Sequence, residues 1–85
     1  MKITQVIFRE IKTSNNPELV SLVDLVFDDM LKLKDIQLLK SERGYYIQFP
    51  QKKTKDEHYY EVFHCVDHSL RNQIFREIMR NYSMR

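Results

Sequence analysis

The stretch Gly44–Val62, GYYIQFPQKKTKDEHYYEV, contains two segments rich in aromatic residues that flank a cluster of lysines. Tyr45–Phe49 predicts one strand, and Pro50 ends its hydrogen bonding because proline has no backbone N–H. Tyr59–Val66 predicts the next strand, so we expect Gln51–His58 to form a basic loop between the two. Lysines held at one edge of a sheet suit a polyanion such as DNA or RNA.

Three further strands are predicted before this stretch, at Lys2–Ile11, Glu18–Phe27 and Leu31–Lys40. Both faces of Glu18–Phe27 are largely apolar, which indicates a strand covered on both sides, by a helix on one face and by a partner subunit on the other. Within Leu31–Lys40 the apolar positions change from odd to even numbers. That change of phase predicts a bulge near Lys34-Asp35.

Turn-forming residues separate these strands. Thr13–Pro17 and Asp28-Asp29 both predict turns, because short polar side chains bond the nearby backbone and proline fixes φ. Gly44 ends the next predicted turn, Ser41–Gly44, and is the only glycine of the chain. We expect it to stand where the backbone needs a positive φ.

The end of the chain predicts one amphipathic helix over residues 68–82, with Asp67 as its N-cap. Apolar residues recur there at helical spacing, namely Leu70, Ile74, Phe75, Ile78, Met79 and Tyr82. The predicted fold is therefore α+β: an antiparallel β-meander of about five strands followed by one C-terminal helix. We expect a single domain over residues 1–85, with the sheet within residues 2–66.

Length and charge limit the class of protein further. A chain of 85 residues has a thin core, so pairing with a second copy would add stability. The net charge is +2, and all of the excess lies after residue 50. The sequence contains neither a secretory signal nor an apolar run of the roughly 20 residues that a membrane-spanning helix needs. We therefore expect a cytoplasmic protein without a membrane partner.

The sequence has no pattern typical of a cofactor, metal or catalytic site. His64, Cys65 and His68 lie close together, but adjacent strand residues point to opposite faces and a zinc site needs four tetrahedral ligands. Nothing indicates an activated nucleophile at Cys65, and a single glycine leaves no loop that could cradle phosphates. We expect no cofactor, no metal and no enzymatic activity.

A set of residues spread over nearly the whole chain carries a family pattern. Its most specific piece is Pro-x-Lys-basic-Thr at residues 50–54. The opening MKITQV and the last twenty residues also fit, and the other matching positions are Asp35–Leu38, Gly44, Asp56, His64 and Arg71. Together these residues resemble the stage V sporulation protein G family (SpoVG), the septation regulators.

The resemblance implies a homodimeric regulator that binds DNA, and also RNA, with a role in gene regulation, septation or sporulation. It implies contact through the basic loop, so the candidate binding residues are Lys52, Lys53, Thr54, Lys55 and Arg71. Lys53 stands where the family has arginine, and lysine grips phosphate or guanine less specifically. Lys55 and Glu57 replace a proline and a glycine, and Cys65 replaces a proline.

Several alternatives stay open at this point. The basic loop is also typical of an ordinary solvated surface, because Asp56 and Glu57 partly neutralise it. A second hypothesis is a protein-interaction module of the cell-division machinery, whose basic loop binds an acidic partner. Aromatic residues beside the loop either stack on unpaired bases or pack in the core and in cross-strand pairs. If any of them stack, Tyr46 and Tyr60 are the better candidates from strand alternation.

Overall fold

The computed structural model describes residues 2–11 and 15–84 and confirms the α+β architecture. The elements in chain order are β1 (Ile3–Arg9), β2 (Leu19–Phe27), β3 (Leu31–Ser41), β4 (Gly44–Gln48), β5 (Gln51–Lys53), β6 (Tyr59–Glu61) and α1 (His68–Ser83). No helix within the described residues is long and apolar enough to cross a membrane.

The first four strands form an antiparallel meander in the order of the chain. The predicted bulge is confirmed. The β2–β3 register shifts between Val23 and Leu25, so Lys34 and Asp35 stand together opposite Asp24. Asp35 has a φ of 68°, and its N–H donates a hydrogen bond to the Asp24 carboxylate at 3.1 Å. The bulge therefore explains why the apolar positions of β3 change phase.

The predicted turns obey the same backbone rules. Asp28 and Asp29 both have positive φ, 52° and 55°, as the tight I′ hairpin turn between β2 and β3 requires. Gly44 has a φ of 121°, as expected for the turn between β3 and β4. Of the first predicted turn, residues 13 and 14 lie outside the described residues. Its later part is closed by Asn16, whose side-chain oxygen accepts a hydrogen bond from the N–H of Glu18 at 2.9 Å.

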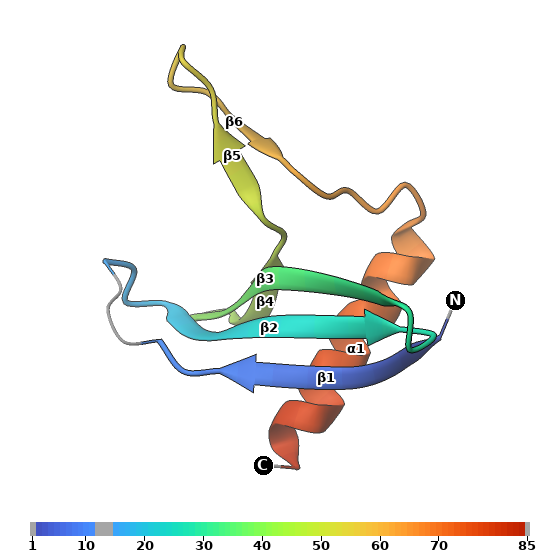
Figure 1. Ribbon diagram of the computed structural model, residues 1–85. Helices are drawn as coiled ribbons and strands as arrows, with labels where there is room; N and C mark the ends of the chain where they lie inside the picture. Colours follow the sequence, from blue (N-terminus) through green and yellow to red (C-terminus); the bar gives the residue numbers. More distant parts are fainter. Residues whose placement is uncertain (1, 12–14, 85) are drawn as a thin grey trace.

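The core lies between one face of the meander and α1, which crosses behind the sheet in Figure 1. Ile74 and Ile78 supply the fully buried part of the helix. Asp67 is the N-cap, as predicted, and accepts hydrogen bonds from the N–H and the hydroxyl of Ser69 at 2.9 and 2.8 Å. The core residues are Val23, Leu25, Phe27, Ile36, Leu38, Ile47, Phe49, Cys65, Ile74 and Ile78.

The opposite face of β2 contains a buried charge among half-buried apolar residues. Asp24 is 2% exposed, and its carboxylate accepts a hydrogen bond from the Arg9 guanidinium at 3.0 Å. Arg9 also pairs with Asp35, which joins β1 to the bulge of β3. Leu22 and Val26 on this face are half-buried. The single subunit therefore satisfies the central charge of this face without a partner.

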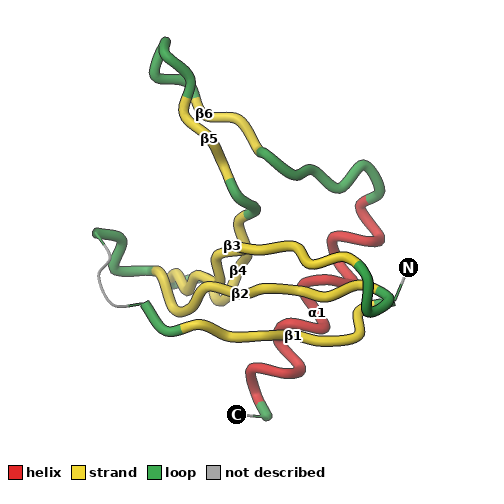
Figure 2. Tube along the Cα trace, in the orientation of Figure 1, coloured by secondary structure: helices red, strands yellow, loops and turns green. Residues whose placement is uncertain are grey.

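The predicted fifth strand of the meander is wrong. Tyr59–Val66 contributes only β6, which pairs with β5 in a separate two-stranded sheet. Lys52 and Lys53 lie within β5, so the expected basic loop is a hairpin. Figures 1 and 2 show this hairpin standing away from the four-stranded sheet. We call β5, β6 and the turn between them the arm, and the four-stranded sheet with α1 the body.

Candidate nucleic-acid interface

Local hydrogen bonds at its two ends define the arm. At the base, the N–H of Val62 donates to the carbonyl of Pro50 at 2.8 Å. At the tip, the Thr54 N–H donates to the His58 carbonyl at 2.7 Å, and the His58 N–H donates to the Thr54 hydroxyl at 3.2 Å. All six residues of β5 and β6 are exposed. Hydrogen bonds rather than apolar burial therefore hold the arm in shape.

The register of the hairpin sorts its side chains onto two faces. Lys52 stands opposite Tyr60, and Lys53 stands opposite Tyr59. Because side chains alternate along a strand, Lys53 and Tyr59 share one face and Lys52 and Tyr60 share the other. Lys55 lies in the turn at the tip. The three lysines thus point in different directions from one projecting element.

The ammonium groups of the arm lysines make few contacts with the described residues. Lys53 lies 3.9 Å from the Glu57 carboxylate and 6.0 Å from the centre of the Tyr59 ring. That ion pair is exposed, so it contributes little and is easily exchanged for a phosphate. Neither Lys52 nor Lys55 forms an ion pair within residues 2–11 and 15–84. The arm therefore presents its positive charge to the solvent.

Thr54 and Glu57 shape the tip. The Thr54 hydroxyl donates to the His58 carbonyl at 3.1 Å and so takes part in closing the turn. Glu57 has a φ of 64°, in the left-handed region, at the position where the family pattern has glycine. A side chain costs about 1–2 kcal/mol in that region, so the glutamate strains a turn that glycine would relax.

Arg71 is not brought together with the lysines. Its guanidinium donates to the carbonyl of Ile47 at 3.3 Å and lies 4.9 Å from the centre of the Phe49 ring. These contacts fasten α1 to the end of β4 and hold the side chain half-buried. The guanidinium of Arg71, which would have to reach a phosphate, is thus engaged in contacts within the fold. Arg71 serves first as a structural residue.

The aromatic residues divide differently from the sequence expectation. The Tyr46 hydroxyl donates to Glu18 at 2.6 Å, and this hydrogen bond raises the pKa of Tyr46. Tyr59 is 65% exposed, more than Tyr60 at 48% and Tyr46 at 39%. Tyr45 packs against Tyr82 with ring centres 5.7 Å apart, so it belongs to the body. Tyr59, which the sequence did not single out, is the most accessible ring.

The possible metal ligands at positions 64–68 do not form a shared site. The His64 imidazole lies 3.4 Å from the Glu61 carboxylate and is exposed, whereas Cys65 is buried in the core. Burial raises the pKa of the Cys65 thiol, which keeps it protonated and unreactive. In the described part of the chain, no group of three or more His, Cys, Asp or Glu side chains could hold a metal ion.

Comparison with known proteins places the chain in a family. The family model SpoVG matches residues 1–84. Similar proteins named "Putative septation protein SpoVG" occur in Borrelia hermsii, 33% identical over 95% of this chain and 80% of the relative, and in Fusobacterium nucleatum, 27% identical over 96% and 88%. A third, in Staphylococcus carnosus, is 27% identical over 96% of this chain and 75% of the relative. The chain belongs to the SpoVG family.

Proposed function

We propose that this protein is a nucleic-acid-binding regulator that grips the phosphate backbone of DNA, and also of RNA, with its arm. One observation carries the proposal: Lys52, Lys53 and Lys55 project on an exposed hairpin, and among the residues that the structure describes only Lys53 has an ion-pair partner, the exposed Glu57. The role is one of binding rather than catalysis. It belongs to the cytoplasm and to gene regulation linked to septation.

The number and type of charges set the character of this binding. Each lysine that neutralises a phosphate releases condensed counterions, so affinity falls steeply with salt. Lysine offers a point charge rather than the planar fork of arginine, so these three residues bind phosphate without reading the bases. Binding through the lysines alone is therefore expected to be weak and independent of sequence.

A salt series on paired variants tests the proposal. Changing Lys52, Lys53 and Lys55 to alanine should flatten the plot of log K against log salt by about 2.7 for duplex DNA, at roughly 0.9 per phosphate contact. A control changes Lys32, Lys34 and Lys40 of β3 to alanine, which removes the same charge from the body. Equal slopes for the parent and the arm variant would contradict the proposal.

We also propose a homodimer, because one copy leaves apolar surface open. A cavity of about 460 Å³ lies between the β2–β3 end of the sheet and the start of α1, bordered by Phe27, Leu33 and Leu70. Leu31 and Val66 line it and are 57% and 91% exposed. Leu31→Lys should shift sedimentation from dimer to monomer, whereas Lys32→Ala beside it should not.

The same cavity favours a second candidate function, in which the chain is a protein-interaction module of the division machinery. An acidic partner protein would then meet the arm, and its apolar residues would cover Leu31 and Val66. The two functions differ in the salt series: the second predicts no measurable affinity for duplex or single-stranded nucleic acid at low salt. It also predicts that Val66→Asp abolishes partner binding.

A further inference from the structure

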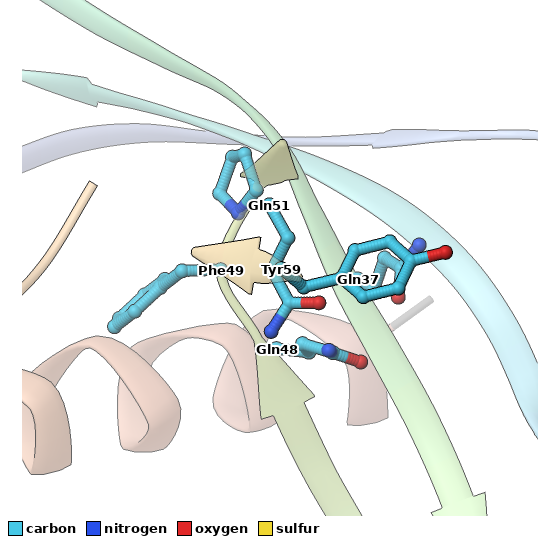
Figure 3. Close-up of a pocket in the computed structure, with 6 residues that line it drawn as sticks. Gln37, Gln48, Phe49, Gln51 and Tyr59 are labelled. Carbon is cyan, nitrogen blue, oxygen red and sulfur yellow. The ribbon is translucent and has the colours of Figure 1, made fainter. Parts of the chain in front are cut away.

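A small polar pocket lies at the foot of the arm, where β4 passes into β5. Its volume is about 210 Å³, and its lining is Gln37, Gln48, Phe49, Pro50, Gln51 and Tyr59. Figure 3 shows the side chains of the three glutamines and Tyr59 gathered there, with the Phe49 ring pointing the other way. Pockets that enclose drug-sized ligands measure roughly 300–1,000 Å³, so this one suits a single planar ring system.

Strand pairing gathers these residues from distant parts of the sequence. Gln37 of β3 stands directly opposite Gln48 of β4, on the sheet face that α1 does not cover. Gln51 follows Gln48 after Phe49 and Pro50 and begins β5. Tyr59 begins β6, two positions of the hairpin away from Gln51. The pocket therefore joins the open face of the body to the arm.

The polar groups of this pocket are free to bind. Within residues 2–11 and 15–84, the side-chain amides of Gln37, Gln48 and Gln51 make no hydrogen bond. A primary amide presents an acceptor oxygen and two donor hydrogens side by side. Three such groups in one small pocket match the adjacent donors and acceptors on the edge of a nucleobase.

Tyr59 adds a stacking surface to these amides. Its ring is 65% exposed, and its hydroxyl makes no hydrogen bond to any residue that the structure describes. Gln51, Lys53 and Tyr59 share one face of the hairpin, because the register places Lys53 opposite Tyr59. A base stacked on Tyr59 would thus have its own backbone phosphate beside the Lys53 ammonium.

From this arrangement we propose that the pocket is a binding site for one unpaired nucleobase of a single-stranded nucleic acid. The inference rests on the proposed function, since the lysines of the arm hold the strand that presents the base. Stacking on a tyrosine requires a base that is free of its duplex neighbours. Adenine is the best match, because a glutamine amide bonds its N6 and N7 together. The lysines supply affinity, and the pocket supplies base preference.

Matched single strands test the site in the full chain. Fluorescence anisotropy compares oligo-dA, oligo-dT and an abasic strand of the same length and charge. The parent should bind oligo-dA at least about fivefold more tightly than the abasic strand, as expected for one stacked base. Tyr59→Leu and the triple change of Gln37, Gln48 and Gln51 to alanine should both reduce that ratio towards one. The salt slope on the abasic strand should stay as in the parent.

Two controls separate this site from its surroundings. Tyr60→Leu removes a ring from the opposite face of the hairpin and should keep the preference of the parent. Gln5→Ala removes an exposed amide from β1 and should also keep it. Circular dichroism checks that each variant folds.

The possible outcomes distinguish this inference from the function on which it rests. A parent that binds abasic and base-bearing strands equally, with a steep salt slope, would overturn the pocket and leave the lysine grip intact. The proposed base site is likewise contradicted if Tyr59→Leu and Tyr60→Leu reduce the ratio of oligo-dA affinity to abasic-strand affinity by the same amount. A parent that binds none of the strands at low salt would overturn the proposed function itself.

Discussion

The body and the arm both contain antiparallel strands, but different forces hold them together. In the body, Ile74 and Ile78 are fully buried against the sheet, and a half-buried ion pair links β1 to β2. In the arm every strand residue is exposed, and hydrogen bonds at Pro50 and Thr54 define the shape. A two-stranded hairpin alone is at best marginally stable in water. The arm therefore depends on the body for its position.

The largest effect should come from the helix side of the body. Ile78→Ala removes a side chain with 0% exposure and should lower the free energy of unfolding by about 2–5 kcal/mol. Tyr60→Ala in the arm is the contrasting change and should lower it by less than about 1 kcal/mol. Urea denaturation followed by circular dichroism measures both. Equal losses would mean that the arm is part of the cooperative core.

Removing the arm is the most direct way to separate the two regions. Val62 donates to the Pro50 carbonyl at 2.8 Å, so residues 51–61 can be replaced by a two-residue Asn-Gly turn. The body should remain folded, with its stability changed by only about 1 kcal/mol, while nucleic-acid binding is lost. Thermal unfolding and anisotropy report the two effects. A body that unfolds without the arm would contradict the division.

A smaller effect is expected at the tip of the arm. Glu57→Gly removes a side chain from a residue with a φ of 64°, and should stabilise the turn by about 1 kcal/mol. In the parent, the amide of residue 57 donates to the Thr54 carbonyl at 3.1 Å, and greater protection of this amide in the variant, relative to its intrinsic exchange rate, would show the effect. Asp56→Gly is the control: Asp56 lacks a positive φ, so glycine should loosen the turn.

The smallest effect concerns how the N-cap of α1 contributes to stability at low pH. Hydrogen bonds from the Ser69 hydroxyl and N–H hold the pKa of Asp67 below its usual value. A carboxyl with a lowered folded pKa stabilises the protein above its unfolded pKa, and this contribution disappears as pH falls through the folded value. Asp67→Asn keeps the cap but cannot titrate. Between pH 5 and pH 2 the free energy of unfolding of this variant should fall by less than that of the parent, as measured by urea denaturation.

The sequence was informative wherever burial imposes a period. The apolar phase change in β3 predicted the bulge at Lys34-Asp35, and the spacing of apolar residues predicted a helix over 68–82 that is observed as His68–Ser83. Gly44 was correctly expected to have a positive φ. The bulge and the helix follow from the requirement that one face of each element meets the core, whereas the φ of Gly44 follows from the geometry of its turn.

The sequence failed where no face is buried. Gln51–Lys53 has no apolar alternation, so nothing in it distinguishes a strand of the arm from a loop. The pocket at the foot of the arm depends on the pairing of Gln37 with Gln48, a register that no local pattern specifies. Nucleic-acid binding by Arg71 stays a prediction, and its contacts with Ile47 and Phe49, which follow from how α1 crosses β4, had no signal in the sequence. The arm strand, the pocket and the contacts of Arg71 all depend on the tertiary structure, which no local sequence pattern specifies.

Amide hydrogen exchange with and without a single-stranded oligo-dA tests the central claim most directly, since it reads both regions in one experiment. In the free protein, amides of β2 and β3 should be strongly protected and those of β5 and β6 weakly protected. Saturating oligo-dA should slow exchange at Lys52, Lys53 and Tyr60, and in the body only on β3 and β4, which carry Gln37 and Gln48 of the pocket. Protection gained on β1, β2 or α1, with the arm as exposed as before, would contradict the account.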